Sequence, residues 1–285
     1  MQSASQYEIF RTVIRKVLDE TETLPSLPAI TLKIRLAVAS QNTTAAQLAR
    51  LISQDPSLSA LLIKYSSSPI YRTTRQPTTL PGIISLLGMS AVSNIVMMHS
   101  VKSLFATKTP QLQKLFNKNW KRQISKASMA VFLASRLGYR PIDEVLITSL
   151  LTEVGTLAVL SALNTTSDVP SEEDYYQLCR DYSKHLASIL LTKWNVDERL
   201  LAVVKYTGEW DEPSSGPMQI IDIINLALYH TVIQSALTPN LPALENLYAY
   251  HKIPAPLNSL TEDGRQLQII EHNADFIDAM TRSLQ

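Results

Sequence analysis

Apolar residues recur at spacings of three and four through most of the chain, and this pattern predicts an all-α protein. In the first predicted helix, residues 7–19, apolar pairs such as Ile9 with Phe10 and Val13 with Ile14 fall on one face. Glycine is scarce, with 7 residues, so few positions interrupt the helical pattern. Further helices are predicted at 29–40, at 44–54, from 55, at 82–87, at 90–105, from 110 to about 137, at 143–163, from 171, from 182, at 218–237, within 239–256 and at 261–282.

Capping residues support several of these helix starts. Thr44 and Gln47 have the spacing of a capping box, and Asp55-Pro56 places a cap before a proline in the first turn. Ser171 is followed by three acidic residues, as expected where a helix dipole presents its positive end. Ser, Thr and Pro are frequent from 66 to 81, which predicts a long surface loop, and 208–217 is predicted to be another loop.

The segment Lys108-Thr109-Pro110 interrupts the pattern and marks the expected boundary between two helical parts. We expect an N-terminal helical part at 1–109, a helical bundle at 110–237 and a C-terminal helical extension at 238–285 packed on the bundle. The first part carries wide apolar faces, so we expect it to pack against the second as one cooperative unit.

Composition limits the compartment and the partners. The balance of 26 Lys and Arg against 25 Asp and Glu gives a net charge of +1, so no overall field attracts nucleic acid or an anionic membrane. Cys179 is the single cysteine, which excludes an internal disulfide and suits a reducing cytosol. The first residues lack the basic and apolar segments of a secretory signal, and no membrane-spanning stretch is predicted. We therefore expect a cytoplasmic protein without a nucleic-acid or membrane partner.

The segment from Ser149 to Leu160 is apolar except for the couple Thr152-Glu153, and Gly155 would allow another helix to pack closely. It is similar to the helix of HD-type metal-dependent phosphohydrolases that carries adjacent His and Asp metal ligands. Here threonine stands where the histidine would be, and a hydroxyl is a poor metal ligand at neutral pH. The segment predicts a helical domain that has kept the fold and lost the chemistry.

A wider resemblance is carried by four segments, 24–29 (LPSLPA), 48–58 (LARLISQDPSL), 61–68 (LLIKYSSS) and 83–88 (IISLLG). Together they closely resemble the first half of the HDOD family, the HD-related output domains of bacteria. Similarity continues through Trp120, the 150–160 helix, His185 and the segment 193–196, weakens toward the C-terminus and ends at about Tyr229. The segment from Pro239 onward resembles no known family. The resemblance implies an HD-type helical bundle with an additional N-terminal helical section, used as a non-catalytic signalling module.

The same resemblance implies that the metal site is dismantled. Arg122 best matches the first HD histidine, with Gln123 as the alternative if the alignment shifts by one residue. Thr152 and Glu153 replace the His-Asp pair, and Leu228 replaces a late aspartate. Only Glu153 could still donate a carboxylate, so we expect no metal, no cofactor and no catalytic residue. Arg122, Thr152, Glu153 and Leu228 are then degenerate positions around a possible binding pocket.

Positive charge accumulates along the predicted helix that starts at 110. Lys114, Lys118, Arg122 and Lys126 follow one another at i, i+4 spacing and form a basic stripe on one face. Lys114 and Lys118 are expected in solvent, whereas the resemblance turns Arg122 toward the former metal pocket. We expect Arg122 to pair with Glu153, because a carboxylate facing an apolar cleft must be neutralised or paired. A basic stripe that leads into a cleft could also receive an anionic ligand such as a nucleotide.

The remaining candidates for chemistry are expected to be structural. No two of the five histidines have the spacing of a metal pair: His185 is expected to cap or pack, and His99, His230, His251 and His272 to lie at the surface or partly buried. Cys179, Trp194 and Trp210 are expected to pack against neighbouring helices. Neither a Gly-x-Ser-x-Gly elbow nor a glycine-rich phosphate loop is present in the sequence.

Three functions remain open at this point. The first is a bacterial HDOD-type signal-transduction protein that binds a signalling protein or a small ligand without catalysis. The second is an HD-type metal-dependent phosphohydrolase acting on a nucleotide with an unusual ligand set. The third is a binding module for a cyclic dinucleotide or another phosphate ligand at the vacated pocket. The ligand count favours the first. Family members often adjoin receiver or cyclic-dinucleotide domains, and here helices fill the chain, so the input is expected from a separate molecule.

Overall fold

The structure is a computed structural model that describes residues 2–20, 24–40, 42–69, 71, 73–74, 76–105, 107–166, 168–210, 216–233 and 241–284, with only the backbone of residues 2–6. Within these ranges the protein is built from helices, and strand-like pairing is limited to one isolated antiparallel bridge between Leu260 and Leu267. The prediction of an all-α fold is confirmed.

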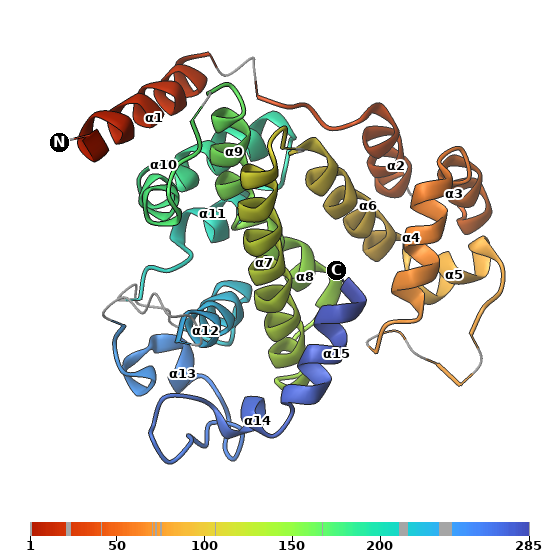
Figure 1. The fold of residues 1–285 in the computed structure, drawn as a ribbon. Coiled ribbons are helices and arrows are strands. Elements are labelled where there is room, and N and C mark those ends of the chain that lie inside the picture. Colours follow the sequence, from red (N-terminus) through yellow and green to blue (C-terminus); the bar gives the residue numbers. More distant parts are fainter. Residues whose placement is uncertain are drawn as a thin grey trace.

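The N-terminal part contains α1 (Gln2–Asp19), α2 (Ala29–Ala39), α3 (Ala45–Ile52), α4 (Pro56–Ser66), α5 (Leu80–Leu87) and α6 (Met89–Leu104). The capping box at Thr44 is confirmed, and Asp55 caps α4 by accepting from the Ser57 amide. Gly88 joins α5 to α6 with a φ of 88°, a backbone angle that favours glycine, and the two helix axes differ by 101°. These turns stack α2 to α6 into a separate layer of helices (Figure 1).

The long helix α7 (Pro110–Arg136) runs through the centre of the remaining helices (Figure 1). Around it lie α8 (Ile142–Leu151), α9 (Val154–Leu163), α10 (Glu172–Lys193), α11 (Glu198–Tyr206) and α12 (Ile220–Ile233). The C-terminal segment adds a 3-10 turn η2 (Leu244–Asn246), α13 (Tyr248–His251), α14 (Gln268–Glu271) and α15 (Ala274–Leu284). The last helix returns to pack along α7.

Three predictions of helix extent were wrong, and one helix was missed. The 143–163 helix is broken at Thr152 and Glu153 into α8 and α9, because both side chains turn to the same polar group on α7. The pair expected from 171 and 182 is the single helix α10, whose sequence contains neither glycine nor proline. The 261–282 helix is a turn followed by α14 and α15, since Gly264 adopts a φ of 68°. Helix α11 was not predicted; Asp197 caps it by accepting from the Arg199 amide.

The predicted helix at 218–237 is α12, which starts at Ile220 and is described to Ile233. The rest of that prediction, 234–237, lies outside the described residues, as do parts of the loops predicted at 66–81 and 208–217.

One continuous apolar core joins the N-terminal helices to the bundle around α7. Helix α6 packs on α8, and at this contact the Asn94 side-chain amide donates to an Asp143 carboxylate oxygen over 3.1 Å. On the other side Arg35 of α2 donates to the Trp194 carbonyl over 2.7 Å, and the Trp194 indole donates to the Pro25 carbonyl over 2.9 Å. The layer of α2 to α6 is thus tied to the bundle by both contacts, and α15 also packs on α4.

The expectation that no apolar stretch reaches membrane-spanning length was wrong, because one stretch in the described residues has the length and hydropathy of a membrane span. Residues Ile142–Leu163 form a stretch of 22 residues with a mean hydropathy of 1.8 in its most apolar part. Of that part, 83% is buried inside the fold, where α8 and α9 pack against α7 and α10. The stretch is therefore accounted for as a core element of the bundle.

Candidate functional site

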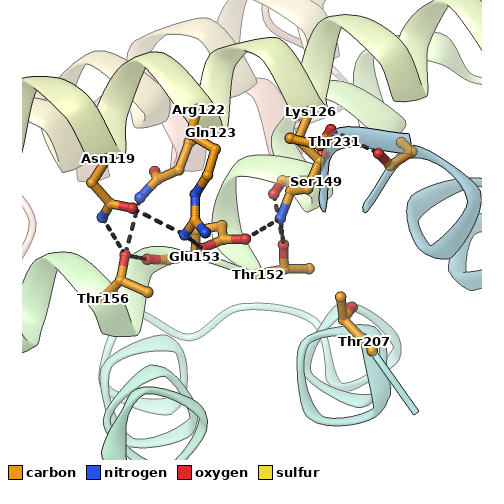
Figure 2. A network of polar contacts seen from close by, with 12 residues as sticks. Asn119, Arg122, Gln123, Lys126, Ser149, Thr152, Glu153, Thr156, Thr207 and Thr231 are labelled. Atoms are coloured by element: carbon orange, nitrogen blue, oxygen red, sulfur yellow. Dashed lines mark hydrogen bonds and ion pairs between the residues drawn. The ribbon is translucent and has the colours of Figure 1, made fainter. Parts of the chain in front are cut away.

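The break between α8 and α9 places Thr152 and Glu153 beside α7. Thr152 ends α8 and its hydroxyl donates to the Ser149 carbonyl over 2.7 Å, while the Glu153 carbonyl accepts from the Thr156 hydroxyl over 2.7 Å. These local bonds hold the two-residue break in one conformation. As a result, adjacent residues that would diverge on a continuous helix both face the same group (Figure 2).

That group is the ammonium of Lys126, one turn of α7 beyond Arg122. Its Nζ donates to Thr152 Oγ1 over 2.7 Å and to Glu153 Oε1 over 2.7 Å, and the Lys126 side chain is 1% exposed. Arg122 Nη2 lies 3.3 Å from Glu153 Oε2, with its side chain 36% exposed. The Glu153 carboxylate is therefore held between two cations from α7 (Figure 2), and we call these three side chains the Arg122–Lys126–Glu153 triad.

A neutral hydrogen-bonded layer continues from the triad toward α10. The Asn119 amide donates to Thr156 Oγ1 over 2.6 Å and to the Tyr175 hydroxyl over 3.0 Å, and its oxygen accepts from Arg122 over 3.2 Å. Gln123 also donates to Thr156 Oγ1, over 3.1 Å. Of the two residues considered for the lost histidine, Arg122 reaches Glu153, while Gln123 reaches Thr156 one turn farther along α9.

The triad carries opposing electrostatic effects. Burial by itself raises the pKa of Glu153, but Lys126 and Arg122 outweigh it and hold the Glu153 pKa below its ordinary value. Burial lowers the pKa of Lys126, and Glu153 opposes that effect. The Arg122 pKa is raised by Glu153, so Arg122 is permanently charged. The geometry is that of an ionised carboxylate satisfied on both oxygens by cations.

The predicted pairing of Arg122 with Glu153 is confirmed, and a second cation that was not predicted, Lys126, also contacts the carboxylate. Lys126 makes the shorter contact and is the more deeply buried. The i, i+4 spacing of the basic stripe contained this signal, since the stripe runs from exposed Lys114 and Lys118 through Arg122 into the interior at Lys126. The expectation that Lys114 and Lys118 are exposed is confirmed.

All four predicted positions come together. Three of them line one small cavity, whose lining is Arg122, Lys126, Glu153, Leu228, Thr231 and Val232. The fourth, Thr152, accepts a hydrogen bond from Lys126. The cavity has a volume of about 20 Å³, which is room for about one water molecule. A nucleotide could enter at this position only if the triad separated.

The donor set does not fit a divalent metal. HD-type chemistry needs several imidazole and carboxylate ligands, whereas this position offers one carboxylate and one hydroxyl beside an ammonium and a guanidinium. Over the described residues, no group of three or more His, Cys, Asp and Glu side chains has a metal-binding arrangement. No reaction step can be routed through a metal held by these residues.

The other candidates divide into two groups. Cys179 is buried, and burial raises the pKa of its thiol to about 12. Trp194 is buried, and the Trp210 ring packs edge-on against Tyr229. The packing roles predicted for these three residues are confirmed. Two histidine predictions were wrong. His185 is exposed on α10 and neither caps nor fills the core, because its position falls on the outer face of that helix.

His230 is fully buried, whereas it was predicted to lie at the surface or to be partly buried. The Leu267 amide donates to its Nε2 over 3.1 Å, so Nδ1 carries the proton and donates to the Leu226 carbonyl over 2.7 Å. Its position on α12 is covered by the C-terminal segment, whose path the sequence pattern did not indicate. His251 and His272 are exposed and His99 is partly buried, as expected.

Comparison with known proteins shows which proteins share this fold. Residues 24–209 match the sequence profile of the HDOD domain. A proposed metal-dependent phosphohydrolase from Shewanella amazonensis SB2B is similar over 100% of both chains, with a TM-score of 0.79 and 18% identity. An HDOD domain protein of unknown function from Geobacter sulfurreducens is similar over 97% of both chains, with a TM-score of 0.65 and 18% identity.

A third similar structure is a proposed signal transduction protein from Marinobacter aquaeolei VT8. It has a TM-score of 0.63 and 20% identity, over 100% of this chain and 66% of the other. No curated protein matches the sequence. At these identities the solved structures show a shared HD-type helical fold, and the activities in their names belong to those proteins.

Proposed function

This chain belongs to the HDOD family, and from that premise we propose that it is a bacterial signal-transduction protein that acts by binding and not by catalysis. The observation that carries the proposal is the ammonium of Lys126 at 2.7 Å from Glu153, with Arg122 on the other carboxylate oxygen. Two cations already neutralise the carboxylate that a metal would need. The site is then a structural remnant of an HD-type centre.

The physical reason is charge. A divalent ion bound at Glu153 would stand beside two positive side chains, one of them 1% exposed, where the low local dielectric strengthens repulsion. Without a metal, neither polarisation of a phosphoryl oxygen nor activation of a bound water is available at this position. The degenerate positions Arg122, Thr152, Glu153 and Leu228 then close the pocket instead of opening it to a substrate.

The partner we propose is a signalling protein. The N-terminal layer presents an apolar surface on α2, where Leu32 is 42% and Leu36 is 72% exposed one helical turn apart. Two adjacent exposed leucines offer a partner protein an apolar contact on this helix, and this is the feature of the surface that supports a protein partner. A small anionic ligand at the vacated pocket, the other partner considered, would require the Arg122–Lys126–Glu153 triad to open.

The test is direct. Protein purified without added metal is assayed for iron, manganese and zinc, and for hydrolysis of phosphomonoesters and nucleotides with Mn²⁺ or Mg²⁺ present. We expect less than stoichiometric metal and no turnover above the buffer rate. Stoichiometric metal that disappears in Glu153→Ala, or turnover that disappears in the same variant, would contradict the proposal and favour an HD-type phosphohydrolase with an unusual ligand set.

A further inference from the structure

A cavity of about 640 Å³ opens between α11, α12 and α13, away from the vacated metal position. Its volume lies within the range of small-molecule sites in proteins. Helix α12 lines both spaces: Asp222 and Asn225 face this cavity, whereas Leu228 and Thr231, farther along the helix, face the small one. The larger cavity is therefore a separate feature of the fold.

Four aromatic side chains stand among the mainly apolar residues that line the cavity. Tyr139, Tyr206, Trp210 and Tyr248 all line it. Trp210 is fixed by an edge-to-face contact with Tyr229 at 6.0 Å between ring centres, and the Tyr229 hydroxyl donates to the Pro242 carbonyl over 3.0 Å. Rings held in place in this way offer preformed surfaces on which a flat ligand can stack at little entropic cost.

The charges at the cavity argue against an anion. Two carboxylates line it, Asp222 and Glu209, and each is paired with a lysine outside the lining, Lys252 at 2.7 Å for Asp222 and Lys184 for Glu209. The cation in the described lining is Arg199, whose guanidinium contacts Asp197 at 3.3 Å and Glu144 at 3.5 Å. A phosphate would have to compete with these carboxylates for its only direct counter-charge.

One further cation lies near the rim without lining the cavity. The Lys205 ammonium is 5.4 Å from the centre of the Tyr206 ring, so it covers one face of that ring. Stacking of a ligand on Tyr206 would use the other face. Trp210 and Tyr248 also line the cavity, and no cation–π contact is found at either ring in the described part of the chain.

Amide groups supply polar contacts inside this aromatic frame. The Asn225 oxygen accepts from the Gly208 amide over 2.9 Å, which fixes the orientation of the side chain. Its NH₂ group has no hydrogen-bond partner within the described part of the chain, and Asn225 lines the cavity. Gln219, exposed at the rim, adds a second amide. Amides with both donor and acceptor atoms match the edge of a nitrogen heterocycle.

We propose that this cavity binds an uncharged planar nitrogen heterocycle of nucleoside size, stacked on the aromatic walls and contacted at its edge by Asn225. The inference goes beyond the proposed function and does not depend on the state of the Arg122–Lys126–Glu153 triad. It differs from the phosphate ligands considered for the vacated position, because the recognition elements are π surfaces and amides and not free cations.

The probes are adenosine, guanosine, cytidine and uridine, each compared with its 5′-monophosphate, by isothermal titration calorimetry and Trp fluorescence on the full chain in EDTA. We expect at least one nucleoside to bind with a Kd below about 1 mM, and its monophosphate to bind at least about fivefold more weakly. Absence of binding by all four nucleosides at millimolar concentration overturns the proposal. A monophosphate that binds as tightly as its nucleoside also overturns it.

Variants locate the binding. Trp210→Ala and Tyr248→Ala each remove one stacking surface and should weaken nucleoside binding at least about fivefold, equivalent to about 1 kcal/mol. Tyr248 is 45% exposed, so its loss should leave the fold intact as judged by far-UV circular dichroism. Phe276→Ala, a 43% exposed aromatic on α15, is the matched control and should bind as the wild type does. Unchanged affinity in Tyr248→Ala and Trp210→Ala, or an equal loss in Phe276→Ala, would rule out this cavity.

Discussion

Lys126 and Glu153 form a buried ion pair across the break between α8 and α9, with 2.7 Å between Nζ and Oε1 and side chains 1% and 13% exposed. The pair joins the central helix α7 to the two-residue break at Thr152 and Glu153. Because the Lys126 ammonium also donates to Thr152, the conformation of the break and the ionisation of Glu153 are coupled. Each triad variant should therefore change the stability of the whole bundle.

Glu153→Ala should destabilise the fold by roughly 3–5 kcal/mol, because it leaves Lys126 buried without its counter-charge. Urea unfolding followed by far-UV circular dichroism measures the loss. The triple variant Glu153→Leu, Lys126→Met and Arg122→Met should recover most of it, since a packed apolar triad has no charge to solvate. The double variant Glu153→Leu with Arg122→Met keeps the buried Lys126 charge and should recover less of the lost stability.

A matched control is the exposed ion pair of Lys118 with Glu172 on neighbouring helices. Glu172→Ala should cost at most about 1 kcal/mol, because exposed pairs are screened by water and salt. If Glu153→Ala were as mild as Glu172→Ala, the Arg122–Lys126–Glu153 triad would not hold the pocket closed.

The sequence predicted the helical fold because the three-and-four spacing of apolar residues determines helix type directly. It also brought Arg122, Thr152, Glu153 and Leu228 to one place, through the resemblance to HD-type helices. It did not predict the break at 152–153. The flanking segments are uniformly apolar, and nothing in their local pattern separates two helices from one. The break depends on Lys126, which is distant along the chain.

The role of Lys126 was missed for a related reason. A lysine in a basic stripe is usually solvated, and the packing of α8 and α12 on α7 decides which member of the stripe is buried. The larger cavity could not be predicted from the sequence either. Tyr139, Trp210, Asn225 and Tyr248 come from separate segments, and their approach depends on the path of the C-terminal extension.

Stability should fall as the pH drops from about 6.5 to about 4, because burial lowers the pKa of His230 from 6.5 to about 4. In that window the unfolded state binds a proton at His230 and the folded state does not, so protons favour unfolding. The loss attributable to His230 should approach roughly 3 kcal/mol across the whole window. Urea midpoints at pH 7 and pH 5 measure the larger part of this loss, about 2 kcal/mol.

His230→Gln should reduce the difference between the two pH values, although it lowers stability at both by disturbing the bonds to Leu226 and Leu267. His185→Gln, an exposed position, should retain the wild-type difference. Equal pH dependence in the wild type and His230→Gln would show that another group is responsible, with His99 the next to test, since burial also lowers its pKa.

The N-terminal helices and the bundle should unfold together, because one apolar core crosses from α6 to α8. Trp120 and Trp194 contact the N-terminal part through Lys102 and Pro25, so both are replaced by Phe, and the fluorescence of Trp210, which packs on α12, then reports the bundle. Far-UV circular dichroism reports all helices. We expect coincident transitions by the two probes. A second dichroism phase without a fluorescence change would indicate independent unfolding of the N-terminal part. A fragment ending at Thr109 should be insoluble or lack fixed packing.

Gly155→Ala should be more disruptive than its single added methyl group suggests. Helix α9 packs on α10 at this position, as the apolar segment around Gly155 predicted, and a Cβ there would lie 1.8 Å from the Ser183 carbonyl oxygen. A backbone atom cannot rotate away as a side chain can, so α9 and α10 must separate. We expect the free energy of unfolding, measured with urea, to fall by at least about 3 kcal/mol, above the usual overpacking range of about 1–3 kcal/mol.

Ala162→Gly on the same helix is the control, and it should lower the free energy of unfolding by about 1 kcal/mol through its lower helix propensity. A loss in Gly155→Ala no larger than in the control would mean that the two helices lie farther apart in solution.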